Sequence, residues 1–138
     1  MTTIAQDRQL HPPAITPETQ AFFDGSARGV LMLKYCDDCK RYHHYPRALC
    51  PHCFSDRTRW TEASGQGCIY TFSVLRLGTP TIFALAYVQL DEGPRMMTNL
   101  VDCDLDALDI GQPVQVVFKP ATDGTMIPMF TPVQGSRA

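Results

Sequence analysis

Cys36-Asp-Asp-Cys39 … Cys50-Pro-His-Cys53 is the stretch that decides the fold of this chain. Ten residues separate its two Cys-x-x-Cys motifs. Two cysteines spaced i, i+3 on a tight turn can hold one metal ion from two sides, and a second pair alongside completes a tetrahedral set of four sulfurs. Such a set suits Zn²⁺ and leaves no open position for water or substrate. We therefore predict a structural zinc site with Cys36, Cys39, Cys50 and Cys53 as its ligands.

Two disulfides, a redox Cys-x-x-Cys pair and chance are the other interpretations of these motifs. A redox pair needs only one motif and a βαβ context, which the sequence lacks. The first fifteen residues hold no continuous apolar run, so no export signal is predicted. A cytoplasmic location is expected, where metal binding is commoner than disulfides. Cys68 and Cys103 are interpreted as small, half-buried apolar residues rather than as nucleophiles.

Length and composition indicate an ordinary globular chain. Its 138 residues are enough for one domain, or for one small domain with an appended module. With 44% hydrophobic and 19% charged residues and a net charge of -2, the chain is not expected to be disordered. No segment approaches the roughly 20 apolar residues of a membrane-spanning helix.

The charge is unevenly distributed along the chain. Basic residues exceed acidic ones by four between residues 28 and 59, whereas acidic residues exceed basic ones by three from residue 64 to the end. The positive stretch therefore coincides with the cysteine motifs. It suits a compact polyanion such as a nucleotide phosphate better than a long nucleic-acid track. Simple solvation of charged loops explains it equally well.

The first half of the chain is predicted to form a loosely held arm over 1–15 and a helix plus zinc ribbon over 16–63. Thr16 is a suitable helix cap, Pro17 fits the first turn, and Gly29 is a natural stop, so we predict a helix over 17–28. Apolar and aromatic runs predict strands over 30–35 and 42–47, on either side of the first cysteine motif.

The second half, residues 64–138, is predicted to be an OB-fold domain. Ser64-Gly-Gln-Gly67 marks the boundary, because it is a cluster of turn-forming residues. Alternating apolar and polar residues then predict five strands, with a mildly helical excursion over 102–111 between the third and the fourth. The predicted strands are 68–75, 81–90, 95–101, 114–119 and 126–131. A closed barrel is favoured over an open sheet because it has no exposed edges.

The ribbon also contains histidines and tyrosines with two possible roles each. The histidines can bind metal, but four cysteines make this unnecessary, so they are interpreted as surface groups or as support for the ligands. The tyrosines can stack on bases, but they are interpreted as cover for a ribbon too small to have a core of its own. These residues are His43, His44, His52, Tyr35, Tyr42 and Tyr45.

Catalysis has little support in the sequence. All four histidines precede the predicted barrel, and the only lysine of the barrel is Lys119. No Ser-His-Asp or Cys-His arrangement and no phosphate-binding glycine loop is found. Acidic residues gather in the turn at 91–92 and in the excursion at 102–109, where turn formation and solvation explain them. A binding or scaffold protein is therefore predicted.

Several motifs resemble one known family. These are Tyr45-Pro-Arg-Ala-Leu-Cys-Pro-His-Cys53, Ser64-Gly-Gln-Gly-Cys-Ile-Tyr-Thr-Phe72, Leu90-Asp-Glu-Gly93, Asn99-Leu-Val-Asp-Cys-Asp104, Ile110-Gly-Gln-Pro-Val114 and Pro128-Met-Phe-Thr-Pro132. Together with the double cysteine motif, they are similar in kind and order to the thiolase-associated zinc-ribbon/OB-fold family, long catalogued as a domain of unknown function. The resemblance covers about residues 16–132. It implies a mainly β protein with a short N-terminal helix, a rubredoxin-like zinc ribbon and a five-stranded OB-fold barrel.

The resemblance also implies a function. Members of this family accompany thiolases, lipid-transfer-protein-like thiolases or aldolases, ketoacyl synthases and hotdog-fold acyl-CoA hydratases. A non-catalytic accessory subunit that binds acyl-CoA or such a partner, in lipid, steroid or ketone metabolism, is therefore expected. Arg47 is a candidate contact to coenzyme A by its charge and position, and Phe72 and Arg76 are further candidates. The alternatives are a nucleic-acid-binding zinc-ribbon/OB-fold module and an independent thioester enzyme using Cys68 or Cys103.

Overall fold

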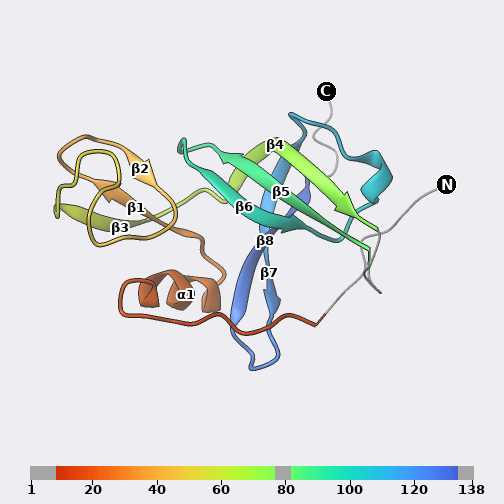
Figure 1. Cartoon of the computed structure of the whole chain (residues 1–138), viewed down its shortest axis with the longest axis horizontal. Helices are drawn as coiled ribbons and strands as arrows, with labels where there is room; N and C mark the ends of the chain where they lie inside the picture. Colours follow the sequence, from red (N-terminus) through yellow and green to blue (C-terminus); the bar gives the residue numbers. More distant parts are fainter. Residues whose placement is uncertain (1–8, 77–81, 134–138) are drawn as a thin grey trace.

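The fold is a small ribbon sheet beside a closed β-barrel (Figure 1). One helix precedes the ribbon in the chain and packs against both parts. A computed structural model describes residues 9–76 and 82–133. The ribbon lies at one end of the long axis, the barrel fills the other, and the helix packs beneath their junction. The predicted mainly β architecture is confirmed.

The single α-helix, α1, spans Gln20–Ala27 and begins later than predicted. Thr19 rather than Thr16 occupies the N-cap position, and it makes no side-chain capping bond to the helix. Its hydroxyl instead accepts a hydrogen bond from the N–H of Thr16 at 3.0 Å, which shapes the turn before the helix. The predicted stop is confirmed: Gly29 has a φ of +78°, and the N–H of Val30 donates to the carbonyl of Gly25 at 2.9 Å.

Three strands form the ribbon sheet, in the order β2-β1-β3. They are β1 (Met32–Cys36), β2 (Tyr42–His43) and β3 (Thr58–Glu62), and both pairings are antiparallel. The sequence interpretation did not include β3. Its central residue Trp60 lies opposite Lys34, whose ammonium stands 4.9 Å from the centre of the indole ring. Because β3 extends the two-stranded ribbon to three strands, it gives the cysteine loops a broader base.

The barrel is closed, with strand order β4-β5-β6-β8-β7, and its β4 and β7 also pair with each other. Its strands are β4 (Gln66–Leu75), β5 (Phe83–Leu90), β6 (Arg95–Leu100), β7 (Pro113–Pro120) and β8 (Met126–Pro132). All pairs are antiparallel except β6 with β8, where Leu100 faces Phe130. The excursion between β6 and β7 contains a short 3₁₀-helix, η1 (Leu105–Ala107). The predicted OB-fold barrel is therefore confirmed, and the open sheet is wrong.

Ribbon, helix and barrel share one hydrophobic core. Phe22 of α1 and Leu33 of β1 are at most 4% exposed and belong to the same buried cluster as Ile69, Leu100 and Phe130 of the barrel. A shared core fixes the orientation of the ribbon on the barrel. This matters for function, because it sets the spacing between the ribbon and the β5–β6 hairpin, which points toward the ribbon (Figure 1).

The N-terminal arm lies partly outside the described residues. Within them, the carbonyl of Leu10 accepts a hydrogen bond from the N–H of Thr122, at 3.0 Å, so this part of the arm lies against the turn between β7 and β8. The predicted start of the second barrel strand, at residue 81, also falls outside. No helix within 9–76 and 82–133 is both long enough and apolar enough to cross a membrane.

Candidate metal centre and the adjoining cleft

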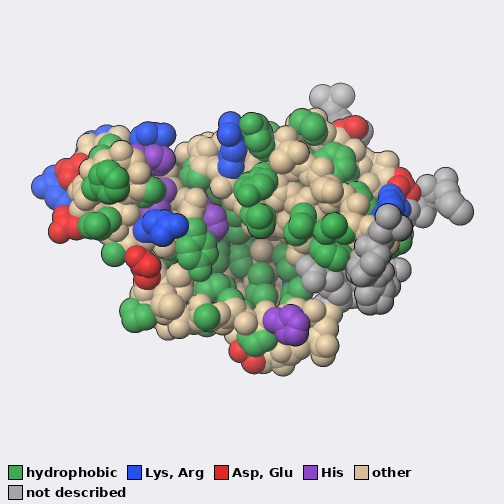
Figure 2. All heavy atoms as spheres, in the orientation of Figure 1, with side chains coloured by type: hydrophobic (Ala, Val, Ile, Leu, Met, Phe, Trp, Pro, Cys, Tyr) green, Lys and Arg blue, Asp and Glu red, His purple; other side chains and the backbone are tan. Residues whose placement is uncertain are grey.

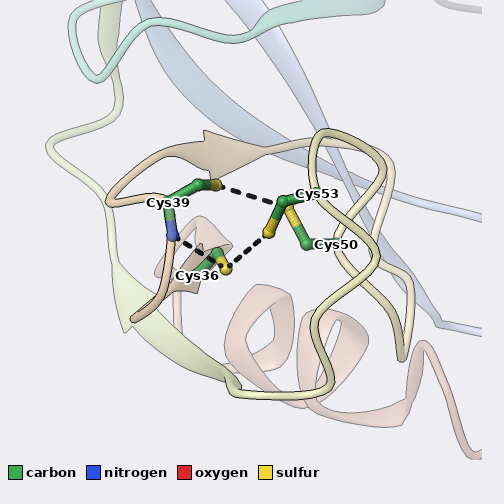
Figure 3. A group of neighbouring side chains, drawn as sticks. All are labelled: Cys36, Cys39, Cys50 and Cys53. Atoms are coloured by element: carbon green, nitrogen blue, oxygen red, sulfur yellow. Dashed lines mark hydrogen bonds between the residues drawn. The ribbon is translucent and has the colours of Figure 1, made fainter.

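The four predicted ligands come together at the tip of the ribbon (Figure 3). The sulfur atoms of Cys36 and Cys53 are 3.6 Å apart, as are those of Cys39 and Cys50, and all four lie within 4.8 Å of one another. All four thiols are free, and these separations are far above the roughly 2 Å of a disulfide bond. Zn–S bonds of about 2.3 Å give a tetrahedron with edges of about 3.8 Å. The arrangement therefore fits Zn²⁺.

Both cysteine loops have the same backbone design. In the first, the N–H of Lys40 donates to the carbonyl of Cys36 at 2.9 Å; in the second, the N–H of Phe54 donates to the carbonyl of Cys50 at 2.8 Å. Lys40 and Phe54 both have a positive φ, at 61° and 64°. Backbone N–H groups also point at sulfur, with the N–H of Cys39 3.5 Å from Sγ of Cys36. This repeated turn aims both sulfurs of each pair at one point.

The thiols differ in acidity when no cation is present. Hydrogen bonds from the N–H groups of Cys39 and Asp38 lower the pKa of Cys36 to about 7, although burial opposes them. Burial and the neighbouring sulfurs raise the pKa of Cys39 to about 12. Four thiolates this close repel one another, so a divalent cation is what allows all of them to ionise together.

The ribbon histidines are not among the four metal ligands. Of the two roles expected for them, a surface position is wrong for His43 and His44, and support for the ligands stays a prediction. His43 is only 3% exposed, and His44 is half-buried against the ring of Phe22, with ring centroids 5.5 Å apart. Burial lowers the pKa of His43 and lowers that of His44 to about 4, where the nearby His43 acts in the same direction. Both imidazoles are therefore neutral at pH 7. His52 is exposed.

A cleft of about 460 Å³ separates this ribbon from the barrel. One wall is the ribbon, from Lys40 to His44 together with Pro51 and His52; the other is the β5–β6 turn, Glu92 to Arg95. Figure 2 shows His, Lys and Arg side chains gathered where the two parts meet. The cleft is thus lined by polar and basic groups from segments far apart in the sequence.

Ion pairs determine which basic side chains of the ribbon have no carboxylate partner and can bind another anion. Asp38 pairs with Arg57 at 3.0 Å, and Asp37 pairs with Arg59 at 2.9 Å. The acidic residues of the first cysteine loop are thereby occupied. Among the described residues, no carboxylate pairs with the cleft's Lys40, Arg41 or Arg95. Two ribbon cations, Lys40 and Arg41, and Arg95 of the barrel therefore line the cleft without a carboxylate partner.

The three residues predicted to contact coenzyme A lie in different places. Arg47 lines a separate hollow on the second cysteine loop, with Leu49 and Phe54. Phe72 is half-buried and packs against the core. Arg76 follows the end of β4, away from the ribbon, and its guanidinium bonds Asp106 at 2.8 Å (Figure 1). The structure does not bring them together in one cavity of the described chain.

No catalytic arrangement is found among the described residues. All of the histidines lie outside the barrel. Cys103 is half-buried, and burial together with the charges of Asp102 and Asp104 raises the pKa of its thiol to about 11. Since a thiol must ionise to act as a nucleophile, Cys103 is unsuited to the role at neutral pH. Cys68 is half-buried in β4, where its paired neighbours are Gln89 and Pro113.

The fold and the four-sulfur site define a zinc-ribbon/OB-fold protein. Family models agree with both parts: the ChsH2 rubredoxin-like zinc ribbon domain matches residues 23–59, and the ChsH2 C-terminal OB-fold domain matches residues 60–119. A DUF35 domain-containing scaffold protein of Methanothermobacter thermautotrophicus is 32% identical over 90 residues, which are 61% of this chain and 68% of that protein. The chain therefore belongs to the ChsH2/DUF35 family.

Three further comparisons place the chain among its relatives. It is 33% identical over 135 residues to a probable enoyl-CoA hydratase alpha subunit of Thermomonospora curvata, which is 94% of this chain but only 42% of that protein. A chain of the Ltp2-ChsH2(DUF35) aldolase superimposes with a TM-score of 0.76 at 32% identity, covering 88% of this chain and 98% of that one. A DUF35-family protein of unknown function from Sulfolobus solfataricus shares the fold, with a TM-score of 0.61 at 12% identity.

Proposed function

We propose that this chain is a non-catalytic accessory subunit of an enzyme complex that acts on acyl-CoA. The observation that carries the proposal is the closed site. Four sulfurs surround the metal position and leave no open coordination position for a substrate. The barrel adds no histidine, and burial raises the pKa of its Cys103 to about 11. A chain with these side chains contributes structure and binding, while a partner supplies the catalytic groups.

The relatives support the kind of complex. One is a scaffold protein by name, one is a hydratase alpha subunit, and one is a chain of an aldolase named for two components. The matched region is less than half of the hydratase subunit, so its activity is not carried over to this chain. We propose a thiolase-like, lipid-transfer-protein-like or hotdog-fold hydratase partner, in lipid, steroid or ketone metabolism. The six free thiols suit a cytoplasmic setting.

Acyl-CoA is the proposed ligand of the complex. Arg47 remains a candidate contact, because it is exposed and no ion pair among the described residues occupies it. Phe72 and Arg76 are candidates only if the partner brings a second part of the ligand to the far end of β4. A shared site of this kind explains why the three residues are separated in the isolated chain.

Gentle purification of the tagged chain from its own cells, followed by mass spectrometry, tests this function. The expected result is a thiolase-, aldolase- or hydratase-like protein in near-stoichiometric amount. Cys36→Ala serves as a control, because loss of the zinc ribbon is expected to release a partner that docks on it. Recovery of nucleic acid in place of an acyl-CoA enzyme would contradict the proposal and favour the nucleic-acid-binding alternative. Steady acyl-CoA turnover by the isolated chain would contradict the non-catalytic role.

A further inference from the structure

Three cations converge on the cleft between the ribbon and the β5–β6 turn. Lys40 and Arg41 come from the end of the first cysteine loop, and Arg95 comes from the first position of β6. Arg95 is held in place, because its guanidinium stacks on Tyr70 at 3.9 Å and its Nε donates to Gln89 at 3.0 Å. Three cations that lack carboxylate partners, one of them held in place, are suited to binding an anion.

The same cleft contains buried polar atoms without hydrogen-bond partners. These are Nδ1 of His44 and Oε1 of Glu92; the ring of His43 is also enclosed, but it lies against the backbone of Arg47. His43 is the most buried of these side chains, at 3% exposed. Buried donors and acceptors normally have a partner. His44 and Glu92 both line the cleft, so a ligand bound there lies beside these two atoms.

Glu92 restricts what that ligand can be. Its Oε2 accepts a hydrogen bond from the N–H of Ser64 at 2.8 Å, and its Oε1 is left needing a donor. A fully deprotonated oxyanion satisfies the three cations but meets repulsion from this carboxylate. A ligand that carries both phosphate oxygens and hydroxyl or amine donors satisfies the three cations and the carboxylate together. Nucleotides have this combination, and the cleft volume is within the range of small-molecule sites.

We propose that the cleft binds the nucleotide part of a phosphorylated ligand. Its phosphates lie against Lys40, Arg41 and Arg95, and its hydroxyl or amine groups donate to Glu92. The half-buried ring of His44 lies beside this ligand on the ribbon side of the cleft. If the proposed function holds, the source is the nucleotide end of coenzyme A; a free nucleotide has the same chemistry. Because the ligand contacts both modules, its binding also fixes the ribbon against the barrel.

Titration calorimetry of the zinc-loaded full chain with four probes distinguishes the sources. Coenzyme A and ADP are expected to bind, inorganic phosphate to bind at least about tenfold more weakly, and pantetheine not to bind. Similar affinity for coenzyme A and ADP identifies the nucleotide as the recognised part. If coenzyme A binds no more tightly than pantetheine, or if inorganic phosphate matches ADP, the proposal is overturned.

Variants locate the binding in the cleft. Arg41→Gln and Arg95→Gln each remove a charge-assisted contact and are expected to weaken ADP binding about tenfold or more. Arg28→Gln is the matched control, since Arg28 is an exposed arginine at the C-cap of α1 outside the cleft, and it is expected to stay within about twofold. Zinc content verifies that each variant is folded. Equal affinities across the cleft variants and the control would place the ligand elsewhere.

Glu92→Gln tests selectivity rather than affinity. The substitution keeps an oxygen that can accept from Ser64 but removes the negative charge that opposes a bare oxyanion. The ratio of ADP to inorganic phosphate affinity is therefore expected to fall by about threefold or more. An unchanged ratio would remove Glu92 from the site. All of these outcomes are independent of the partner purification, so failure of the cleft proposal leaves the accessory-subunit proposal to its own test.

Discussion

The ribbon and the barrel are stabilised in different ways. The ribbon places four sulfurs around one point and contributes little buried apolar surface at its tip, where Leu49 is 51% and Phe54 is 78% exposed. The barrel encloses fully buried side chains such as Val88, Val114 and Phe130, and every strand pairs on both sides. Metal ligation therefore holds the first region, and apolar burial holds the second.

This difference has a functional consequence. A metal-held ribbon does not need an apolar surface, so its loops can carry uncovered charges such as Lys40 and Arg41. The barrel supplies the rigid wall that faces them and the carboxylate of Glu92. The site we propose thus lies where a polar, metal-held module meets a well-packed one, and the two modules should respond differently to perturbation.

The largest difference is expected from loss of a metal ligand. Cys50→Ala removes one of four sulfurs, and structural zinc contributes an apparent 10–16 kcal/mol, roughly, to folding in zinc-finger peptides. The variant should lose its zinc and the amide signals of residues 32–62, whereas the barrel signals stay dispersed. Zinc analysis and an amide NMR spectrum provide the measurement. Cys68→Ala is the control and should keep its zinc; retention of zinc by Cys50→Ala would contradict the ligand assignment.

Truncation of a core side chain in the barrel is expected to have the opposite result: the barrel is destabilised and zinc is retained. Phe130 is fully buried and faces Leu100 in the parallel pair of the barrel. Phe130→Ala should lower the free energy of unfolding by about 3–5 kcal/mol, because it leaves a cavity in a packed core. Urea unfolding followed by circular dichroism measures the loss. In native buffer the zinc content should remain at one per chain; a loss below about 1 kcal/mol would mean that the barrel is not packed as described.

Acid should affect the ribbon before the barrel, since the barrel has no histidine. The folded pKa of His44, about 4, lies below the ordinary value of 6.5. The unfolded chain therefore binds the proton first, and stability falls as the pH drops from about 6.5 to 4, by at most about 3 kcal/mol. NMR titration of the His44 ring should show a midpoint near 4, and a higher one in urea. A folded midpoint near 6.5 would contradict the burial of this ring.

An effect of comparable size is expected at the junction of the two modules. Gly65 has a φ of +76°, and a Cβ there would lie 2.6 Å from Cγ1 of Val116. Gly65→Ala should cost about 1–2 kcal/mol for the backbone and about as much again for the clash. Gly124→Ala is the matched control, because Gly124 has a φ of +90° but no atom near a Cβ. Equal losses of thermal stability in the two variants would show that the Val116 side chain can move away from the new Cβ without destabilising the protein.

The smallest effect should come from the surface charges of the ribbon. Arg59 pairs with Asp37 at 2.9 Å, but both side chains are well exposed. Arg59→Gln should change the free energy of unfolding by less than about 1 kcal/mol, because water and salt screen such pairs. Thermal melts of the zinc-loaded protein at two salt concentrations measure it. A larger, salt-independent loss would mean that ion pairs, in addition to zinc, hold the ribbon.

Local patterns in the sequence were sufficient for the metal centre and most of the strands. The spacing of Cys36, Cys39, Cys50 and Cys53 determines which sulfurs can meet, and alternation of apolar residues identifies the barrel strands. The stop at Gly29 was equally local, since only a residue tolerant of positive φ fits there. These features depend on neighbours in the chain, so the sequence alone contains them.

Features that depend on distant segments were missed. β3 forms only because β1 lies beside it, although the alternation of Thr58, Trp60 and Glu62 was a weak signal. His43 is buried, whereas a surface position was one of the two roles expected for it. The sequence showed that the ribbon has an excess of positive charge, but not where that charge lies. Asp37 and Asp38 pair with Arg59 and Arg57, so they do not neutralise the basic residues of the cleft.

Zinc-edge X-ray absorption of the purified chain tests the central claim most directly, namely that the ribbon is a closed structural module without a reaction site. Four sulfur neighbours at about 2.3 Å, with no oxygen or nitrogen in the first coordination shell, are expected from Cys36, Cys39, Cys50 and Cys53. A fit that requires a water oxygen or an imidazole nitrogen at about 2.0–2.1 Å would contradict the closed site. It would also reopen a catalytic role for the metal.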